Sequence, residues 1–125
     1  MGATRDVALT ELPFRGISIN PDAAGTTVNV VASDSGVMFI NKEDASAVTY
    51  NLPAVADAKG KMFWFFEAQL SYGMVITAPA NTMFMANDLA ATTATATAQA
   101  GCAGFVICDG TSYYFFEIYG TWAAA

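Results

Sequence analysis

Hydrophobic residues occur in short runs along the chain, and turn residues separate these runs. The three runs in the middle are Val37–Ile40, Val48–Leu52 and Met62–Phe66. Charged and polar residues at 41–44 separate the first two runs, and Pro53 closes the second. Proline cannot continue the interior of a strand, because it has no backbone N–H to donate. The pattern therefore predicts three short β-strands with an aromatic core.

The third run indicates which face of its strand is buried. Side chains alternate between the two faces of a strand. One face carries only apolar residues, namely Met62, Trp64, Phe66, Ala68 and Leu70. The other face has Phe63 and Phe65 between polar neighbours. We expect the first face to be buried along its length and the second only in the middle, as in a central strand between two layers.

Short strands with frequent turns continue through the rest of the chain. Asp109-Gly110 is a hairpin turn signal between the last two runs, and 123–125 reads as a plain tail. No segment has a convincing helical period, although 54–59 could hold one helical turn. We predict an all-β fold, a β-sandwich or jelly-roll-like barrel of about eight to ten short strands. The further predicted strands are Thr26–Ala32, Met74–Ala78, Thr82–Met85, Ala103–Cys108 and Tyr113–Tyr119.

Threonine and alanine alternate strictly within Ala90–Ala100. A two-residue period is typical of a strand, and threonine is a poor helix former. This segment is predicted to be a strand whose alanine face allows close approach of a neighbouring sheet or chain, with an exposed loop as the alternative. Its candidate interface residues are Thr93, Ala94, Ala96 and Ala98.

The first twenty residues differ from the remainder. Their apolar residues are spread out and interrupted by Pro13 and Gly16. We divide the chain into an extended N-terminal arm, 1–20, and a β-sandwich domain, 21–125. An ordinary first strand is the alternative to the arm. The arm's candidate contacts to another protein surface are Leu9, Leu12, Phe14 and Ile17.

Composition indicates that part of the surface is covered. Hydrophobic residues make up 54% of the 125 residues and charged residues 13%, against about 25% charged in an average domain. A single soluble copy would have difficulty covering so much apolar surface. We therefore expect a homo-oligomer.

The charge excludes some partners. The net charge is −6, and no lysine or arginine follows Lys61. A phosphate-binding groove needs clustered cations, so direct nucleic-acid binding is not expected. No apolar run approaches the ~20 residues that span a bilayer, and Met1–Glu11 has no apolar signal core, so neither a membrane contact nor secretion is expected.

Little catalytic chemistry is present. The chain has no histidine and no nucleotide-binding glycine motif, so we expect neither an enzyme nor a cofactor or metal. Asp34, Glu43 and Asp44 could bind a hard cation, although solvated loop charges are the simpler interpretation. Glu67 and Glu117 could form a carboxylate pair for glycoside hydrolysis, although interface residues are the simpler interpretation.

Cys102 and Cys108 are the two cysteines. On one strand they would lie about 20 Å apart, which is too far for a disulfide. We predict buried free thiols, since a disulfide would need a tight turn between them.

Several motifs occur in a fixed order between Asp34 and Trp122. They are D-S-G-V-M-F-I-N, A-V-T-Y-N-L-P-A, G-K-M-F-W-F, D-G-T-S-Y-Y and G-T-W. Together they resemble a module of tailed-phage virion proteins, which occurs in head-decoration (cement) proteins and in tail-fibre-like proteins. The resemblance carries no catalytic motif, so it implies no catalytic residues.

The resemblance implies a capsid decoration protein that binds and stabilises the major capsid protein shell. Such a protein would be a homotrimer on the outer capsid surface of the virion, made in the host cytoplasm. The alternative is a receptor- or glycan-binding tip domain of a tail fibre, which usually follows a shaft with repeats, and the chain has none. A small esterase or glycosidase is a weaker third hypothesis, which the missing histidine disfavours.

Overall fold

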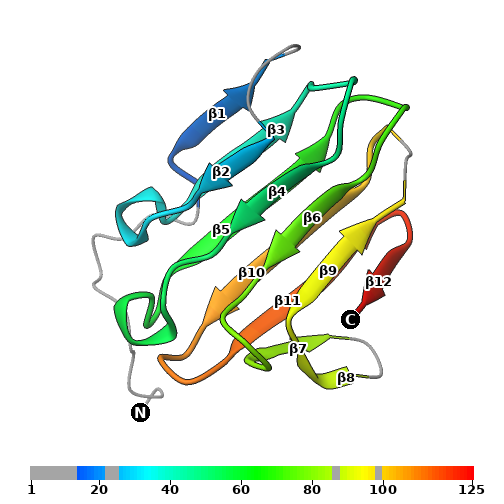
Figure 1. The fold of residues 1–125 in the computed structure, drawn as a ribbon. Coiled ribbons are helices and arrows are strands. Elements are labelled where there is room, and N and C mark those ends of the chain that lie inside the picture. Colours follow the sequence, from blue (N-terminus) through cyan, green and yellow to red (C-terminus); the bar gives the residue numbers. More distant parts are fainter. Residues whose placement is uncertain (1–13, 22–25, 86–87, 98–99) are drawn as a thin grey trace.

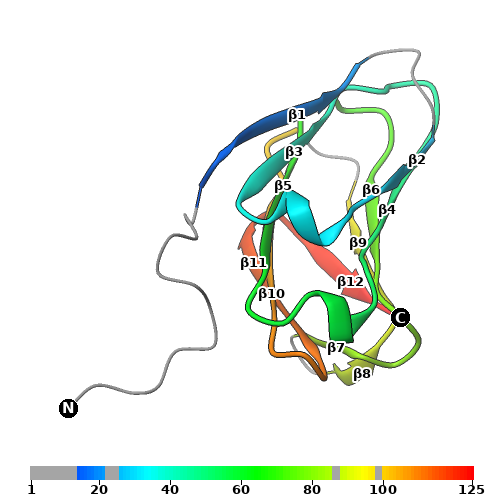
Figure 2. The same ribbon diagram turned by 90° about the vertical axis from the view of Figure 1, so that its left-hand side faces the viewer.

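Two β-sheets face each other and make up nearly all of the fold (Figures 1 and 2). The computed structural model describes residues 14–21, 26–85, 88–97 and 100–125. Within these ranges the only helical elements are two 3-10 turns. One of them, Val55–Asp57, lies in the predicted helical turn. The all-β prediction is confirmed, but the strands outnumber the predicted eight to ten. They are β1 Gly16–Asn20, β2 Thr27–Asn29, β3 Val37–Asn41, β4 Val48–Asn51, β5 Met62–Glu67, β6 Met74–Thr77, β7 Met83–Met85, β8 Asp88–Ala91, β9 Thr93–Ala96, β10 Ala103–Cys108, β11 Tyr113–Tyr119 and β12 Trp122–Ala124.

The first six strands form a stack of three parallel rungs. Consecutive strands alternate between the sheets, so that β1, β3 and β5 pair in parallel in one sheet, and β2, β4 and β6 in the other. Gly16 pairs with Val37, and Met38 pairs with Trp64, so successive rungs are offset by 21 and 26 residues. This arrangement is solenoid-like. The jelly-roll expectation was wrong, because jelly rolls are built from antiparallel strands.

Antiparallel strands close one side of the rung stack. The hairpin β10–β11 is added beside β5, and β9 and β12 are added beside β6. The hairpin turns at the predicted position, where Gly110 has a φ of 93°. The sheet orders are β1-β3-β5-β10-β11-β7-β8 and β12-β9-β6-β4-β2. The expectation of a plain C-terminal tail was wrong for Ala123 and Ala124, because both belong to β12 and pair with β9.

The core lies between the two sheets and is centred on aromatic rings. Phe39 and Phe65 from the seven-stranded sheet contact Tyr50 from the five-stranded sheet, with ring centroids 5.5–5.8 Å apart. All three side chains are buried. Rings that interlock across the gap between two layers hold the sheets at a fixed separation.

The buried face of β5 is the opposite of the predicted one. Phe63, Phe65 and Glu67 point into the core and are fully buried, while Met62, Trp64 and Phe66 alternate with them and remain partly exposed. The prediction assumed that the face with polar residues faces solvent. Instead, the Glu67 side chain is buried between the sheets, where it accepts a hydrogen bond from Asn41.

The alternating threonine and alanine segment forms two strands rather than one. β8 ends at Ala91 and β9 begins at Thr93. Ala94 and Ala96 are buried in the core of their own chain. The alanine face therefore allows close approach of the chain's own facing sheet, and Ala98 lies outside the described residues.

The segment at the start of the chain includes an ordinary edge strand. Gly16–Asn20 is β1, which pairs in parallel with β3. The alternative of a first strand therefore holds for these five residues. Residues 1–13 of the predicted arm, with Leu9 and Leu12, lie outside the described residues.

Candidate functional site

The outward side of the seven-stranded sheet is a broad apolar surface. Its central row runs across five adjacent strands, and the strand register places the residues of this row side by side. Because neighbours across a ladder point to the same side, the row forms a continuous stripe. Its members are Ile17, Met38, Trp64, Phe105 and Phe116.

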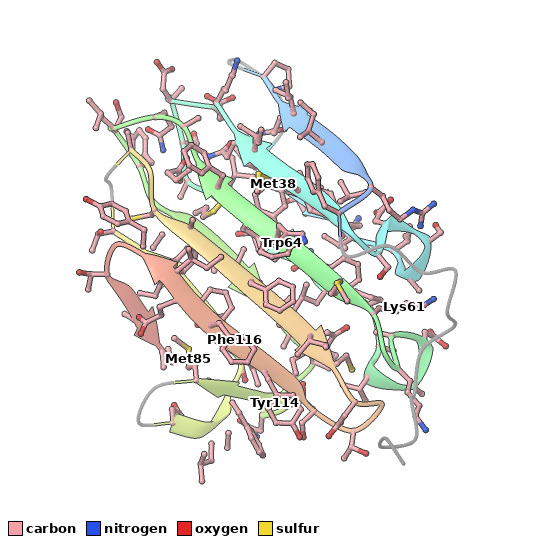
Figure 3. All side chains as sticks on the ribbon, turned by 180° about the vertical axis from the view of Figure 1, so that it is seen from behind. Met38, Lys61, Trp64, Met85, Tyr114 and Phe116 are labelled. Carbon is pink, nitrogen blue, oxygen red and sulfur yellow. The ribbon has the colours of Figure 1, made fainter. Side chains whose placement is uncertain are left out.

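Two shorter apolar rows flank the central row. On one side, Ile19 pairs with Ile40, and Ile40 pairs with Phe66. The row on the other side consists of Met62, Ile107, Tyr114 and Phe84. We refer to the three rows together as the aromatic face. Figure 3 looks directly onto this face, with Met38, Trp64, Tyr114 and Phe116 spread across it.

The rings of the central row contact one another and form a rigid platform. The Trp64 and Phe105 ring centroids are 4.3 Å apart, and Phe105 and Phe116 stack at 5.8 Å. Such pairs contribute about 0.5–1.5 kcal/mol each beyond the area that they bury. The platform is therefore preorganised, and a partner that binds it would not have to order these side chains.

The aromatic face and the neighbouring Phe14 expose an apolar area as large as the largest patch on a typical monomer. Ile17 is 57% exposed, and Phe14 and Phe116 are each 53% exposed. With Ile19, these side chains alone leave roughly 400 Å² of apolar surface in water. The largest patch on a typical monomer is about 300–600 Å², and the partly exposed members of the three rows add to the sum. Surfaces of this size usually mark binding sites.

Two of the predicted interface residues meet on this face. Phe14 lies just before β1 and lines a shallow apolar hollow with Met38 and Trp64. Ile17 begins the central row. Thr93, by contrast, is partly buried on β9 in the five-stranded sheet. The expected aromatic core holds only part of the aromatic residues, and the platform that surrounds Phe14 and Ile17 was not predicted.

Charged side chains are missing from the outward positions of β1, β3, β5 and β10, four strands that the structure describes in full. In the flanking row, the Tyr114 hydroxyl donates to the Asp109 carboxylate at 2.5 Å. Such a surface suits another apolar protein surface, because it offers few hydrogen bonds to a polar ligand.

A row of polar residues crosses the inward side of the same sheet. Asn20 donates to Asn41 at 3.1 Å, and Asn41 donates to Glu67 Oε1 at 2.9 Å. The register aligns these three residues across β1, β3 and β5. We call this row the polar ladder. Burial raises the pKa of Glu67 to about 7, although the hydrogen bond from Asn41 partly opposes the shift.

The polar ladder predicts a pH dependence of stability. The native state keeps a proton on Glu67 up to about pH 7, whereas the unfolded chain releases it near 4.5. The contribution of Glu67 to stability should therefore be fully present below about pH 4.5 and be lost as the pH rises through this window. We expect Glu67→Gln to remove this fall and to stabilise the protein by about 2 kcal/mol at pH 8.

Thermal unfolding between pH 4.5 and 8 tests this prediction. Glu117→Gln is the matched control, because Glu117 is an exposed glutamate of the same sheet. It should retain the fall in melting temperature. An unchanged pH profile in Glu67→Gln would contradict the assignment.

The predicted carboxylate sites have structural partners instead. Asp34 accepts from the Val31 backbone N–H at 3.1 Å, and Glu43 accepts from the Ala45 N–H at 2.8 Å. Glu117 accepts from the Trp122 N–H at 3.2 Å, and β10 separates its strand from that of Glu67. Within the described ranges, no three metal-binding side chains come together.

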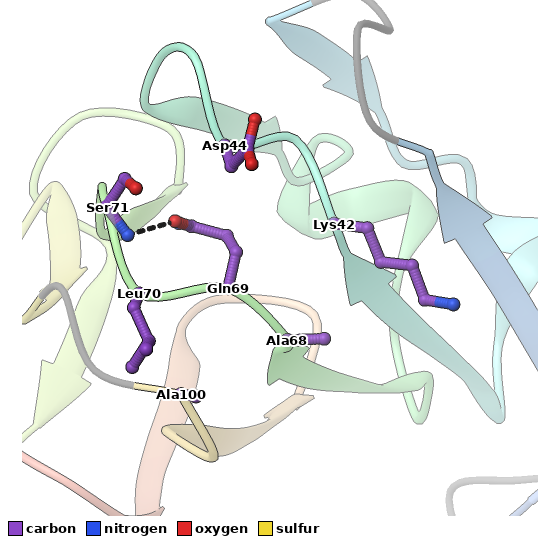
Figure 4. Close-up of a pocket in the computed structure, with 7 residues that line it drawn as sticks. All are labelled: Lys42, Asp44, Ala68, Gln69, Leu70, Ser71 and Ala100. Atoms are coloured by element: carbon purple, nitrogen blue, oxygen red, sulfur yellow. Dashed lines mark hydrogen bonds between the residues drawn. The ribbon is translucent and has the colours of Figure 1, made fainter.

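A second hollow lies at one end of the sheets, and its polar groups do not converge. Gln69 accepts from the backbone N–H groups of Ser71 and Tyr72, so its side chain supports the loop itself. Lys42 and Asp44 extend in different directions (Figure 4). This hollow therefore shows no arrangement of groups suited to a reaction.

Both cysteines are buried thiols that form no disulfide, as predicted. Burial raises the pKa of the Cys108 thiol, which disfavours the reactive thiolate at neutral pH. Cys102 and Cys108 therefore act as core residues.

Comparisons with known proteins do not assign a family. No protein-family model matches the chain, and no curated protein matches it. Among the described residues, no helix is long and apolar enough to span a bilayer. The functional argument therefore rests on the aromatic face and on the motifs between Asp34 and Trp122.

Proposed function

We propose that this protein is a non-enzymatic decoration protein of a tailed-phage head, a homotrimer that binds the major capsid protein shell and stabilises it from outside. The aromatic face supports the oligomeric part of this proposal, because it is a large and uncharged surface of the kind that protein partners cover. The resemblance of Asp34 to Trp122 to phage virion proteins supplies the identity of the assembly.

The composition of the aromatic face favours a protein partner over a glycan. Sugars are held by stacking together with several hydrogen bonds from well-placed polar groups. The outward positions of β1, β3, β5 and β10 are all apolar. This observation supports the decoration role over the alternative of a receptor- or glycan-binding tip.

The acidic character of the chain is compatible with a place on the outer capsid surface. The net charge of −6 would disfavour contact with packaged nucleic acid. A protein made in the host cytoplasm that binds the closed shell, and not its dissociated subunits, stabilises the shell by mass action. Many weakly bound copies then act together.

Deletion of residues 1–13 tests the shell-binding role and leaves β1 intact. We expect the full chain to co-sediment with undecorated shells and to raise their melting temperature. The deletion should weaken binding at least tenfold, because it removes the predicted anchors Leu9 and Leu12. Each extra copy bound per shell adds protection, so the shift should follow occupancy.

Leu70→Glu is the control, because Leu70 is a highly exposed apolar residue outside both the arm and the aromatic face. This variant should bind as the unaltered chain does. Equal shell binding by the truncated and full chains would refute a clamping role for the arm. A full chain that ignores shells but binds host cells or glycans would instead support the fibre-tip alternative.

A further inference from the structure

We infer that the aromatic face is the surface on which copies of this chain assemble with one another. The inference rests on the proposed function only for the claim that the protein is an oligomer. It adds which surface of the chain forms the subunit interface. It assigns the central row, from Ile17 to Phe116, to the middle of a subunit interface. Contact with the shell is then left to other surfaces of the oligomer.

The dimensions of the face match a stable interface. Five strands at ~4.8 Å spacing and three rows at ~6.6 Å spacing give a footprint of roughly 24 by 20 Å. The projecting side chains make the accessible area larger than this flat footprint. A standard interface buries about 800 Å² on each partner, so contacts with neighbouring copies could cover the face almost completely.

The distribution of charge allows the face to meet its own copy. Identical residues of the copies meet around the axis of a symmetric oligomer, so a charged residue near that axis would face a like charge. The chain is strongly acidic, yet no charge lies at the outward positions of β1, β3, β5 or β10, all within the described ranges. Lys61 lies at the margin of the face in Figure 3. An apolar centre with a polar rim is the usual anatomy of a subunit interface.

A second copy is also the partner that is present before any shell is encountered. Each free chain would otherwise expose the aromatic face in solution, where a patch of this size promotes aggregation. Phe14 lines an apolar hollow together with Met38 and Trp64 of the central row. Phe14 itself is 53% exposed, so it leaves the face open to another molecule.

Two substitutions at the ends of the central row test the interface. Phe116→Glu and Ile17→Glu each place a charge on an exposed side chain, so the fold should survive. We expect sedimentation equilibrium to show an oligomer for the unaltered chain. Each variant should associate at least 100-fold more weakly, because it would bury an unpaired carboxylate. Leu70→Glu adds the same charge at a 70% exposed position away from the face and should assemble normally.

Tryptophan fluorescence provides a second readout. Trp64 lies in the central row, whereas Trp122 is buried in the core of its own chain. Acrylamide should therefore quench the two glutamate variants more than the unaltered chain at equal concentration. Circular dichroism that matches the unaltered chain would show that the variants remain folded.

The outcomes separate this inference from the proposed function. A monomer mass for the unaltered chain at 100 µM would overturn the inference, and so would variants that assemble as well as the control. Monomeric variants that are folded and more readily quenched would support it. An oligomer that depends on the aromatic face but ignores shells would leave the inference standing and refute shell binding.

Discussion

Replacement of Trp122 by alanine is expected to lower the free energy of unfolding by about 3–5 kcal/mol. Trp122 begins β12 and is only 6% exposed. Its ring centroid lies 4.8 Å from that of Phe115, and its indole N–H lies 3.2 Å from the carbonyl oxygens of Ala103 and Tyr119. The substitution would open a cavity and leave these acceptors without their donor. Urea unfolding at constant pH measures the loss.

Two control variants separate the contributions of Trp122. Trp122→Phe keeps an aromatic ring and removes the N–H, so it should cost less than the alanine variant. Ala123→Ser alters the exposed neighbour in the same strand and should change stability by less than about 0.5 kcal/mol. A loss below 1 kcal/mol for Trp122→Ala would show that β12 contributes little to the core.

Gly73→Ala is expected to destabilise the protein by about 3 kcal/mol or more. A Cβ at position 73 would lie 1.9 Å from the carbonyl oxygen of Ala96. That oxygen belongs to the backbone of β9, so it cannot move aside as a flexible side chain could. The strand would have to shift, and the packing of Ala94 and Ala96 in the core would be disturbed. Chemical unfolding of the purified variant gives the measurement.

Gly101→Ala is the control that separates a steric collision from the backbone strain of a non-glycine residue at positive φ. Gly101 has a φ of +91°, and its nearest neighbour would be the Tyr119 ring at 3.8 Å. This variant would suffer backbone strain without a collision, at a cost of about 1–2 kcal/mol. If Gly73→Ala costs no more than Gly101→Ala, close approach of β9 is not what requires glycine at position 73.

Local turn chemistry made much of the strand pattern predictable. The hairpin β10–β11 turns at Asp109-Gly110 as expected, and β3, β4 and β5 lie within or next to the predicted runs. These features depend on residues that are neighbours in sequence. The parallel pairing of β1, β3 and β5 depends instead on contacts between residues more than twenty positions apart, which no local pattern specifies.

The inward and outward faces of β5 could not be assigned from the sequence. Both faces carry large apolar residues, so the usual contrast between core and solvent is missing. The same ambiguity concealed the aromatic face, because partly exposed Trp64 and buried Phe65 look equally suited to a core. Phe14 and Ile17 were predicted as interface residues only because they lie in the N-terminal arm, outside the predicted sandwich domain. Ala123 and Ala124 carry no strand signal, and their strand forms because Trp122 and β9 hold them in place.

The polar ladder gives the rung stack a means of alignment that its apolar residues cannot provide. Sliding one rung by two residues past the next would keep the same side chains inside and replace one apolar contact by another. Asn20, Asn41 and Glu67 oppose such sliding, because their hydrogen bonds form only when all three stand in one row. Any displacement would leave a buried amide or carboxylate without its partner, which is costly. These three polar side chains thus fix the register of β1, β3 and β5, whose two faces are otherwise mostly apolar.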